Sequence, residues 1–471
     1  MVIGENKKAV IWSGVDKVAG YIVHFSIQII LARMLMPDDY TVVAMLAIFL
    51  AISQAFIDSG FATTLIQKKN CTEHDYSSVF YFNILISIIV YCILFTCAPA
   101  IEKFYSFPNL ATVTKVYSLC LVISAFGMVN RVILTKKLKF KKIAIISLAA
   151  SILSAIPAII LAFDGFGYWA LVIQNLVSSA ISVILYFYYS RWRPRLMFSM
   201  KSIKSLAPFG FRILIIYIFH AIYNNIYSLL IGKRYPAADL GYYDRGKTLA
   251  GTAPIGFSDF FTRAVYPIQA KNQDNKEFLE SSYNRSFATS VFIIVPICIF
   301  LCVFSYQSIF TLFGNQWLES AMILSILSIG YMFYPLQALN MTMLKVGGCA
   351  DYLMQSEIIK KVLGIVAVII AINYSLEIVV LSWTICAIGE FIISECYFAK
   401  LFHFTIFKTL KILVVQVLVS FAASIIVLIL SQAISNNNYI VFFCGGLVYL
   451  VVYFGISLTI NRHILELIAI R

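Results

Sequence analysis

Polar and charged side chains recur at helical spacing inside segments that are otherwise apolar. Residues 9–34 place them at intervals of four, four, three and four: Ser13, Lys17, Tyr21, His24 and Gln28. Residues 245–268 use intervals of three, four, four, three and four: Arg245, Thr248, Thr252, Gly256, Asp259 and Arg263. Positions three or four apart lie on one face of an α-helix. Each segment therefore predicts an apolar helix with one polar face.

Two further segments carry shorter polar rows. Residues 41–66 contain Gln54 and Asp58, four positions apart. Residues 206–231 place on one face Tyr217, His220, Asn224 and Tyr227, with Arg212 a little over two turns before the histidine. Ionisable groups at membrane depth are costly and usually face a cavity or a partner. We therefore expect the four polar rows to converge on one polar cavity.

This predicted cavity would be rich in cations. Its expected substrate-binding residues are Lys17, His24, Arg212, His220, Asn224, Arg245, Lys247 and Arg263. The basic side chains outnumber the acidic ones around them, which are Asp16, Asp58, Asp244 and Asp259. A net positive cavity suits a strongly anionic ligand such as a diphosphate, for which arginine offers bidentate donors. For a coupling ion, H+ or Na+, the candidate sites are Asp58, Asp259 and His220.

Each of these groups also has a purely structural explanation. Asp259 and Arg263 can neutralise each other on one helix, because they are four positions apart. His24 and His220 can be hydrogen-bonded packing residues, and Asn224 can bond across helices as polar residues in bundles do. Both interpretations stay open at the level of sequence.

The elements that position these residues must be membrane helices. Of the 471 residues, 61% are hydrophobic and 12% are charged, against about 45–50% and about 25% in soluble domains. This composition excludes a water-soluble enzyme, a disordered chain and a secreted disulfide scaffold. The ten cysteines show no metal-binding spacing, and we interpret them as small buried apolar residues.

The predicted fold class is therefore an all-α polytopic membrane protein with about 14 transmembrane helices. The predicted spans are residues 9–34, 41–66, 78–100, 112–135, 143–163, 168–190, 206–231, 245–268, 286–308, 320–344, 357–373, 377–399, 409–433 and 440–460. Lysine and arginine gather in alternate connections, with 25 of the 36 on the side that holds both termini. Basic loops are cytoplasmic, so the expected orientation is N-in/C-in, and most of the +14 net charge reflects orientation rather than nucleic-acid binding.

The chain also contains an internal repeat. Residues 56–70 (FIDSGFATTLIQKKN) match residues 257–272 (FSDFFTRAVYPIQAKN), with Asp58 opposite Asp259. The offset equals six predicted spans, which preserves direction, so the repeat is parallel and typical of transporters that bind substrate between two halves. We expect a six-helix lobe over 1–195, a second six-helix lobe over 196–405, and two additional helices with a short tail over 406–471.

Several segments in order resemble the bacterial polysaccharide repeat-unit flippases, the Wzx-type lipopolysaccharide and exopolysaccharide exporters of the multidrug/oligosaccharidyl-lipid/polysaccharide exporter superfamily. They are ILARMLMPDDY (30–40), FIDSGFATTLIQKK (56–69), FYFN (80–83), APAIEKFY (98–105), GFGYWALV (165–172), LIGK (230–233), LGYY (240–243) and GNQW (314–317). The chain departs from that family at Thr41, where the family usually has glycine, and at Tyr227, where it often has aspartate.

The resemblance implies two lobes that work by alternating access, with undecaprenyl-diphosphate-linked oligosaccharide as cargo. Such a flippase moves its cargo from the cytoplasmic to the periplasmic leaflet of the inner membrane, for the synthesis of O-antigen, capsule or exopolysaccharide. Its polyprenyl tail would stay in lipid, along the last two helices. The expected partners are this substrate, membrane lipids, a polysaccharide polymerase and a chain-length regulator, with no nucleic acid, cofactor or metal.

Three other functions are weighed against this one. A cation-coupled multidrug antiporter of the same superfamily would need an anionic cavity. A membrane polymerase or ligase would need a sizeable outer catalytic loop, whereas the predicted outer loops are short. A non-transporting scaffold would not need polar rows through four helices. No Walker A, nucleophile-elbow or His-Glu-x-x-His motif occurs in the sequence, so we expect a non-enzyme.

Overall fold

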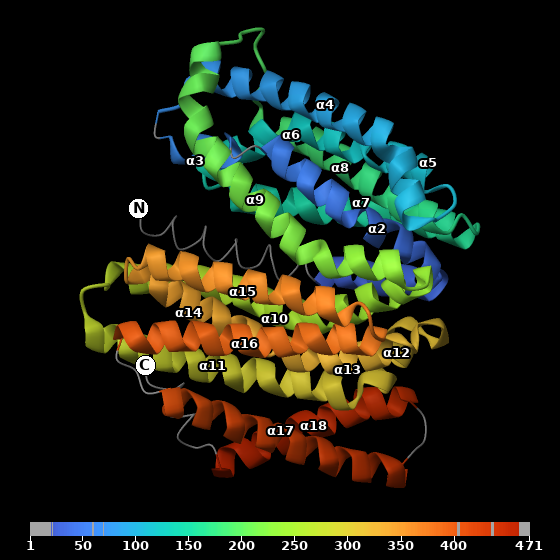
Figure 1. The fold of residues 1–471 in the computed structure, drawn as a ribbon, viewed down its shortest axis with the longest axis vertical. Coiled ribbons are helices and arrows are strands. Elements are labelled where there is room, and N and C mark those ends of the chain that lie inside the picture. The colour runs from blue at the N-terminus through green and yellow to red at the C-terminus, as the bar shows by residue number, and fades with distance from the viewer. Residues whose placement is uncertain are drawn as a thin grey trace. The chain divides into compact units, whose positions relative to one another are not determined.

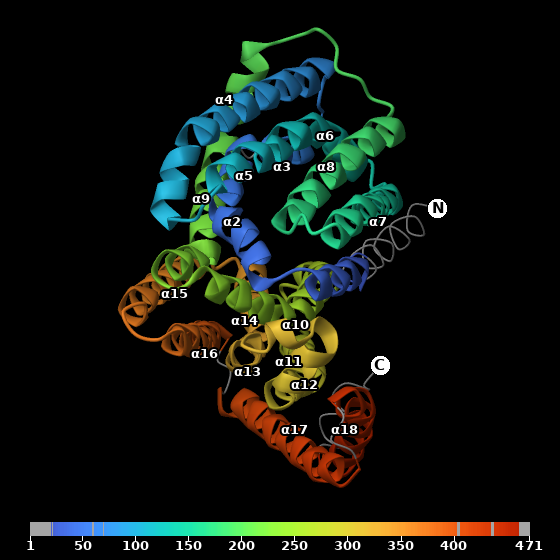
Figure 2. The same ribbon diagram turned by 90° about the vertical axis from the view of Figure 1, so that its right-hand side faces the viewer.

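The computed structural model describes residues 20, 22–58, 61–68, 70–402, 406–434 and 438–460. Throughout these residues the regular structure is helical. The helices pack into two compact units, Met1–Gly241 and Tyr242–Arg471, and each is described by itself (Figures 1 and 2). This division does not test the lobe boundaries predicted from the repeat, which stay a prediction.

The first unit contains a short apolar helix, Ile22–Met34, followed by eight helices. These are α2 (Pro37–Asp58), α3 (Phe61–Gln67), α4 (Glu73–Tyr105), α5 (Leu110–Tyr117), α6 (Leu119–Lys136), α7 (Phe140–Phe163), α8 (Tyr168–Ser190) and α9 (Met200–Arg234). Helix α10 (Ala237–Lys271) begins in the first unit and continues into the second.

The second unit continues with helices up to residue 460. These are α11 (Lys276–Val303), α12 (Ser305–Phe313), the 3-10 turn η1 (Asn315–Trp317), α13 (Ser320–Tyr331), α14 (Tyr334–Val346), α15 (Ala350–Ala371), α16 (Leu376–Phe402), α17 (Ile406–Ile434) and α18 (Asn438–Ile460). Helices α17 and α18 pack against each other, and α17 also packs along α11.

Within the described residues, eleven helical segments are long and apolar enough to cross a membrane. They confirm an all-helical membrane architecture. Three predicted spans are not among the eleven: 9–34, 245–268 and 357–373. In the first, residues 9–19 and 21 lie outside the described residues, and Ile22–Met34 forms a short apolar helix. The other two lie largely in α10 and α15, each of which carries more than two charged residues.

The ends of several helices follow from local sequence. Pro37 begins α2, where its missing N–H costs nothing. Thr72 caps α4: the Asp75 amide donates to the threonine hydroxyl over 3.3 Å, and the Thr72 amide donates to the Asp75 carboxylate over 2.9 Å. Lys68 forms an ion pair with the same carboxylate at 2.7 Å. This reciprocal capping satisfies backbone groups that a helix start would otherwise leave without partners.

Thr41, the departure from the resembled family, makes a specific contact in the first unit. Its hydroxyl donates to the carbonyl oxygen of Ala237 over 2.6 Å. Next to this contact, a Cβ atom at Gly241 would lie 2.3 Å from the Pro37 carbonyl oxygen. The first turns of α2 and α10 therefore touch, and glycine at 241 is required by the close approach of the two backbones.

The core of the first unit lies where α3, α4, α6 and α9 meet. It is built from Phe61, Leu65, Val79, Phe80, Met128, Val129, Val132, Ile133, Ile203 and Leu206. In the same unit α7 and α8 pack side by side, and α8 also packs against α6 (Figure 2). The α6–α8 contact brings the polar faces of these two helices next to α2.

In the second unit, two tyrosine hydroxyls of α18 form hydrogen bonds to the backbone of α11 near a proline. Pro296 lies inside α11, so it cannot supply the helical N–H for the carbonyl of Phe292. The hydroxyl of Tyr453 donates to that carbonyl over 2.7 Å, and Tyr449 donates to the Pro296 carbonyl over 2.9 Å. In a lipid environment an unpaired carbonyl is expensive, so these bonds fix α18 on α11.

Candidate functional site

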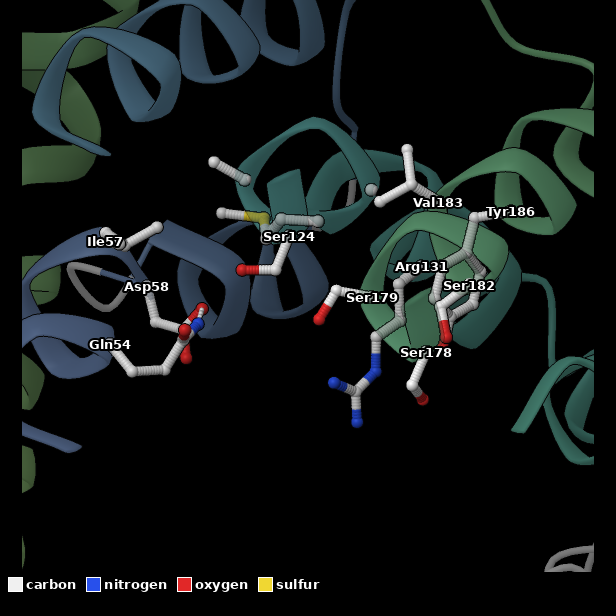
Figure 3. Close-up of a pocket in the computed structure, with 13 residues that line it drawn as sticks. Gln54, Ile57, Asp58, Ser124, Arg131, Ser178, Ser179, Ser182, Val183 and Tyr186 are labelled. Carbon is white, nitrogen blue, oxygen red and sulfur yellow. Dashed lines mark hydrogen bonds between the residues drawn. The ribbon is translucent and has the colours of Figure 1, made fainter. Parts of the chain in front are cut away.

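A polar pocket lies inside the first unit, between α2, α6 and α8. Its volume is about 230 Å³. Its lining combines a carboxylate, an amide, a guanidinium and several hydroxyls: Gln54, Asp58, Ser124, Arg131, Ser178, Ser179, Ser182 and Tyr186. Figure 3 shows Gln54 and Asp58 on one side of the pocket and Arg131 with the α8 serines on the other. All three helices belong to candidate membrane spans.

The α2 side of the pocket is a hydrogen-bonded pair. The Gln54 side-chain amide donates to the Asp58 carboxylate over 3.2 Å. The predicted i,i+4 relation of these residues on one helix face is therefore confirmed. One carboxylate oxygen accepts this bond, and both side chains line the pocket, where the remaining acceptors of Asp58 can meet a ligand.

The opposite side is formed by one arginine and a serine row. Ser178 and Ser182 are four residues apart on α8, and Ser179 lies beside them toward the pocket (Figure 3). Arg131 extends from α6 and is exposed. Within the described residues its guanidinium forms no ion pair or hydrogen bond.

The walls of the pocket are held by close packing of α6 against α8. A Cβ atom at Gly127 would lie 3.1 Å from the Val183 side chain, so glycine permits the two helices to approach. One helical turn away, Ser190 donates to the Oδ1 atom of the fully buried Asn130 over 2.6 Å. Both contacts flank the part of the pocket that Arg131 lines, and they fix the backbone from which it extends.

This arrangement can bind a ligand that is both anionic and rich in hydroxyls. The guanidinium offers a planar fork of N–H donors that matches phosphate oxygens. The serine hydroxyls donate or accept, and Asp58 and Gln54 supply acceptors for hydroxyl groups. In the described part of the chain, no group of three or more His, Cys, Asp or Glu side chains could hold a metal ion.

Of the residues predicted to line a cavity, five belong to the first unit. Lys17 lies outside the described residues, and of Arg212 only the position in α9 is described. His24 is exposed on the helix Ile22–Met34. His220 and Asn224 are exposed on α9, and the Asn224 amide nitrogen lies 2.7 Å from the His220 Nδ1 atom. The structure thus brings His220 and Asn224 together on one helix face.

The other predicted residues lie on α10 in the second unit. Arg245 is 5% exposed, forms an ion pair with Asp244 at 3.0 Å and lies over the Trp317 ring at 6.0 Å. Lys247 lies over the Tyr243 ring at 5.7 Å. Asp259 is half-buried and Arg263 is exposed. The charge of Arg245 is therefore compensated within its own unit, a pairing that a count of cations does not detect.

Arg131 and the serines of α6 and α8 were not predicted as site residues. Arg131 is an isolated charge in an apolar run, with no second charge at helical spacing. The serine row of α8 does have a signal, since positions 178, 179 and 182 lie on one face. Small hydroxyl residues are common in membrane helices, so the row alone does not indicate a site.

Fold and pocket together define a multi-pass helical membrane protein with a polar site embedded among its apolar helices. A protein family described as "Polysaccharide biosynthesis protein" matches residues 30–322, which is more than half of the chain. The chain belongs to this family. The resemblance found in its sequence is thereby confirmed.

Curated relatives come from several bacteria. The chain is 26% identical over 301 residues to the teichuronic acid biosynthesis protein TuaB of Bacillus subtilis (strain 168), a match covering 64% of this chain and 62% of the relative. It is 25% identical over 306 residues to the lipopolysaccharide biosynthesis protein WzxC of Escherichia coli (strain K12), covering 64% and 61%. The matched region thus spans less than two thirds of each relative.

Solved structures share the fold. The lipid II flippase MurJ, in an inward closed conformation, aligns with a TM-score of 0.76 at 17% identity, covering 97% of this chain and all of that one. An inward-facing multidrug resistance MATE family transporter of the MOP superfamily aligns with a TM-score of 0.60 at 15% identity, covering 82% and 98%. At this identity the alignments establish the fold and not the substrate.

Proposed function

We propose that this chain is a flippase for a lipid-linked oligosaccharide. Its cargo is a repeat unit on undecaprenyl diphosphate, moved by alternating access from the cytoplasmic to the periplasmic leaflet of the bacterial inner membrane for surface polysaccharide synthesis. The observation that carries the proposal is the pocket of Arg131, Asp58 and the α8 serines among membrane helices, in a chain of the polysaccharide biosynthesis family.

The pocket supplies the two kinds of contact that such a headgroup needs. Arg131 binds diphosphate oxygens through its paired N–H donors. Asp58, Gln54 and the serines bind sugar hydroxyls. With a volume of about 230 Å³ the pocket holds part of the headgroup. The other proposed substrate-binding residues are those expected from the sequence: Lys17, His24, Arg212, His220, Asn224, Arg245, Lys247 and Arg263.

The proposed membrane arrangement keeps fourteen spans with both termini inside. Its support is the bias of 25 of 36 basic residues toward one side. Helices α10 and α15 cross the membrane in this arrangement although each carries several charged residues. The lobes 1–195 and 196–405 and the additional pair 406–471 move as units, and Asp58, Asp259 and His220 remain candidates for the coupling ion.

The polyprenyl tail fits an apolar groove between α11 and α18. The groove has a volume of about 540 Å³. Aromatic and aliphatic side chains form its walls, and Pro296 and Gly446 also line it. A 55-carbon polyprenyl chain gains free energy by burying methylene and methyl groups. This groove is on one of the two last helices, where the tail is expected.

The experiment is complementation of a deletion strain, followed by analysis of its lipids. Deletion should cause an undecaprenyl-diphosphate-linked oligosaccharide to accumulate on the cytoplasmic side, and the intact chain should clear it. Arg131→Gln removes a charge-assisted hydrogen bond of about 1.5–3 kcal/mol, so export should fall about tenfold or more. Arg131→Lys keeps the charge without the fork and should give an intermediate rate.

Arg193→Gln is the matched control, because Arg193 is an exposed arginine in the loop between α8 and α9 and not a pocket residue. It should export at the wild-type rate. Full export by Arg131→Gln at equal protein levels would remove the pocket from the mechanism. A multidrug antiporter is the alternative, and drug resistance conferred on a pump-deleted strain, without any change in lipid-linked sugars, would favour it.

A further inference from the structure

A buried carboxylate in the second unit is surrounded by polar side chains from four helices. Glu395 of α16 accepts a bond from the Asn340 amide of α14 over 2.8 Å. Its other carboxylate oxygen accepts from the Thr409 hydroxyl of α17 over 2.8 Å. The Tyr283 hydroxyl of α11 lies 3.2 Å from Glu395 and 2.7 Å from the Asn340 carbonyl oxygen. Ser394 accepts from the Asn340 amide over 3.2 Å.

This cluster is closed to solvent. Glu395 and Thr409 are each 2% exposed, and Tyr283, Asn340 and Ser394 are fully buried. All five side chains belong to candidate membrane spans. Bonds between residues 112, 55 and 14 positions apart in the chain make the cluster a tertiary feature that no local pattern predicts.

No basic side chain that the structure describes forms an ion pair with this carboxylate. Among the described residues Tyr283 is the only titratable group that contacts Glu395. Of the lysines on the contributing helices whose side chains are described, Lys345, Lys400 and Lys411 are all exposed. The buried Lys360 of α15 pairs with Glu357 instead. Neutral donors reduce the cost of a buried anion, but an uncompensated charge inside a membrane protein remains expensive.

The cluster also provides the ligands of a small cation. Hydrogen bonds join five oxygen atoms there: the two of the Glu395 carboxylate, the Asn340 amide oxygen and the hydroxyls of Tyr283 and Thr409. Each hydroxyl oxygen can accept as well as donate, because its hydrogen rotates. Hard oxygen ligands with a single negative charge match one monovalent cation better than a divalent one.

We propose that Glu395, with Asn340, Tyr283 and Thr409, binds one monovalent cation, either a proton or Na+. Binding neutralises the buried carboxylate. Because Thr409 lies near the start of α17 while the other ligands belong to α11, α14 and α16, an occupied site also holds the α17–α18 pair to the rest of the unit. The site is separate from the polar pocket of the first unit, and its occupancy is measurable whether or not the chain moves lipids.

The test compares purified full-length wild type with Glu395→Gln, a substitution that removes the charge and nearly preserves the shape. Melting is followed by tryptophan fluorescence in NaCl and in choline chloride at equal ionic strength. If the ion is Na+, the melting temperature of the wild type rises by about 2 °C or more at saturating Na+. Glu395→Gln loses this rise entirely, and Thr409→Val shifts the half-saturating Na+ concentration upward.

Infrared difference spectroscopy distinguishes the proton. If the ion is a proton, Na+ has no specific effect, and wild type in Na+-free buffer shows a protonated carboxyl band that Glu395→Gln lacks. This measurement on wild type remains informative even if a variant folds poorly. Thr384→Val is the control, because Thr384 is a buried α16 residue whose hydroxyl donates to the Ile326 carbonyl over 2.9 Å, away from the carboxylate.

The control should keep whichever of the two signals the wild type shows, the Na+ response or the infrared band. Either the Na+ response or the band, when it depends on Glu395, supports the site and identifies its ion. A wild type with neither signal contains a permanently ionised, structural carboxylate, and that result overturns the proposal. Loss of flipping with intact cation binding would instead count against the proposed function alone.

Discussion

The variant Tyr453→Phe removes one hydroxyl group from α18. It should reveal how much free energy of unfolding is lost when the carbonyl that Pro296 leaves without a helical donor has no other donor. Tyr453 is 1% exposed, and its hydroxyl donates over 2.7 Å to the Phe292 carbonyl, the group that Pro296 leaves without a helical donor. Gln416 of α17 also contacts this hydroxyl. In the variant Tyr453→Phe the ring still packs between α11 and α18, but the carbonyl loses its donor.

The expected loss can be worked out from these contacts. A buried carbonyl left without a donor costs about 1–3 kcal/mol, and lipid surroundings keep water from replacing the donor. We take about 2 kcal/mol, which changes the ratio of folded to unfolded protein by roughly thirtyfold. Pro296→Ala restores an N–H at position 296, which can donate to Phe292. In that background Tyr453→Phe should cost only about 0.5–1 kcal/mol.

The assay is a double-mutant cycle on the free energy of unfolding, followed by tryptophan fluorescence during denaturation in detergent micelles. The coupling energy between Tyr453→Phe and Pro296→Ala should be about 1 kcal/mol or more. Tyr188→Phe on α8 is the control, since Tyr188 is 72% exposed, and should leave stability unchanged. Equal costs of Tyr453→Phe in both backgrounds would refute the role assigned to the proline.

Two more predictions concern stability. Asp75→Ala removes the capping carboxylate of α4 and leaves the Thr72 amide and Lys68 without their acceptor. The free energy of unfolding, measured by melting, should fall by about 1–2 kcal/mol. It should fall less in Asp75→Asn, which keeps the cap but not the ion pair. If both variants melt like wild type, the cap contributes nothing. Gly246→Ala would place a Cβ atom 2.8 Å from the Ile323 side chain and 3.1 Å from the Leu324 amide nitrogen. Helices α10 and α13 must then separate, which should lower the free energy of unfolding by about 1–3 kcal/mol. An unchanged unfolding midpoint would contradict this tight contact.

The sequence contains enough information to predict the helices and much of their local pairing. Long apolar runs predict membrane helices because their backbone groups must be satisfied within the segment. Spacing within one helix predicts contacts such as Gln54 with Asp58 and His220 with Asn224, both of which the structure contains. Such contacts depend only on helical geometry.

Contacts between helices could not be predicted in the same way. Arg131 lines a pocket because Gly127 lets α6 approach α8 at a particular rotation, and the apolar sequence around it does not determine that rotation. The position of Arg245 over the Trp317 ring likewise depends on the fold. Glu395 meets its partners only after four helices have packed together.

Lipid translocation in a purified system tests the central claim most directly. Proteoliposomes carrying the chain and an undecaprenyl-diphosphate-linked oligosaccharide would be probed with a glycosidase that cannot cross the bilayer. We predict that wild type makes the inner-leaflet oligosaccharide accessible to the enzyme, and that Arg131→Gln slows this about tenfold or more. Accessibility no greater than in protein-free liposomes, with the reconstituted protein folded, would contradict the proposed function.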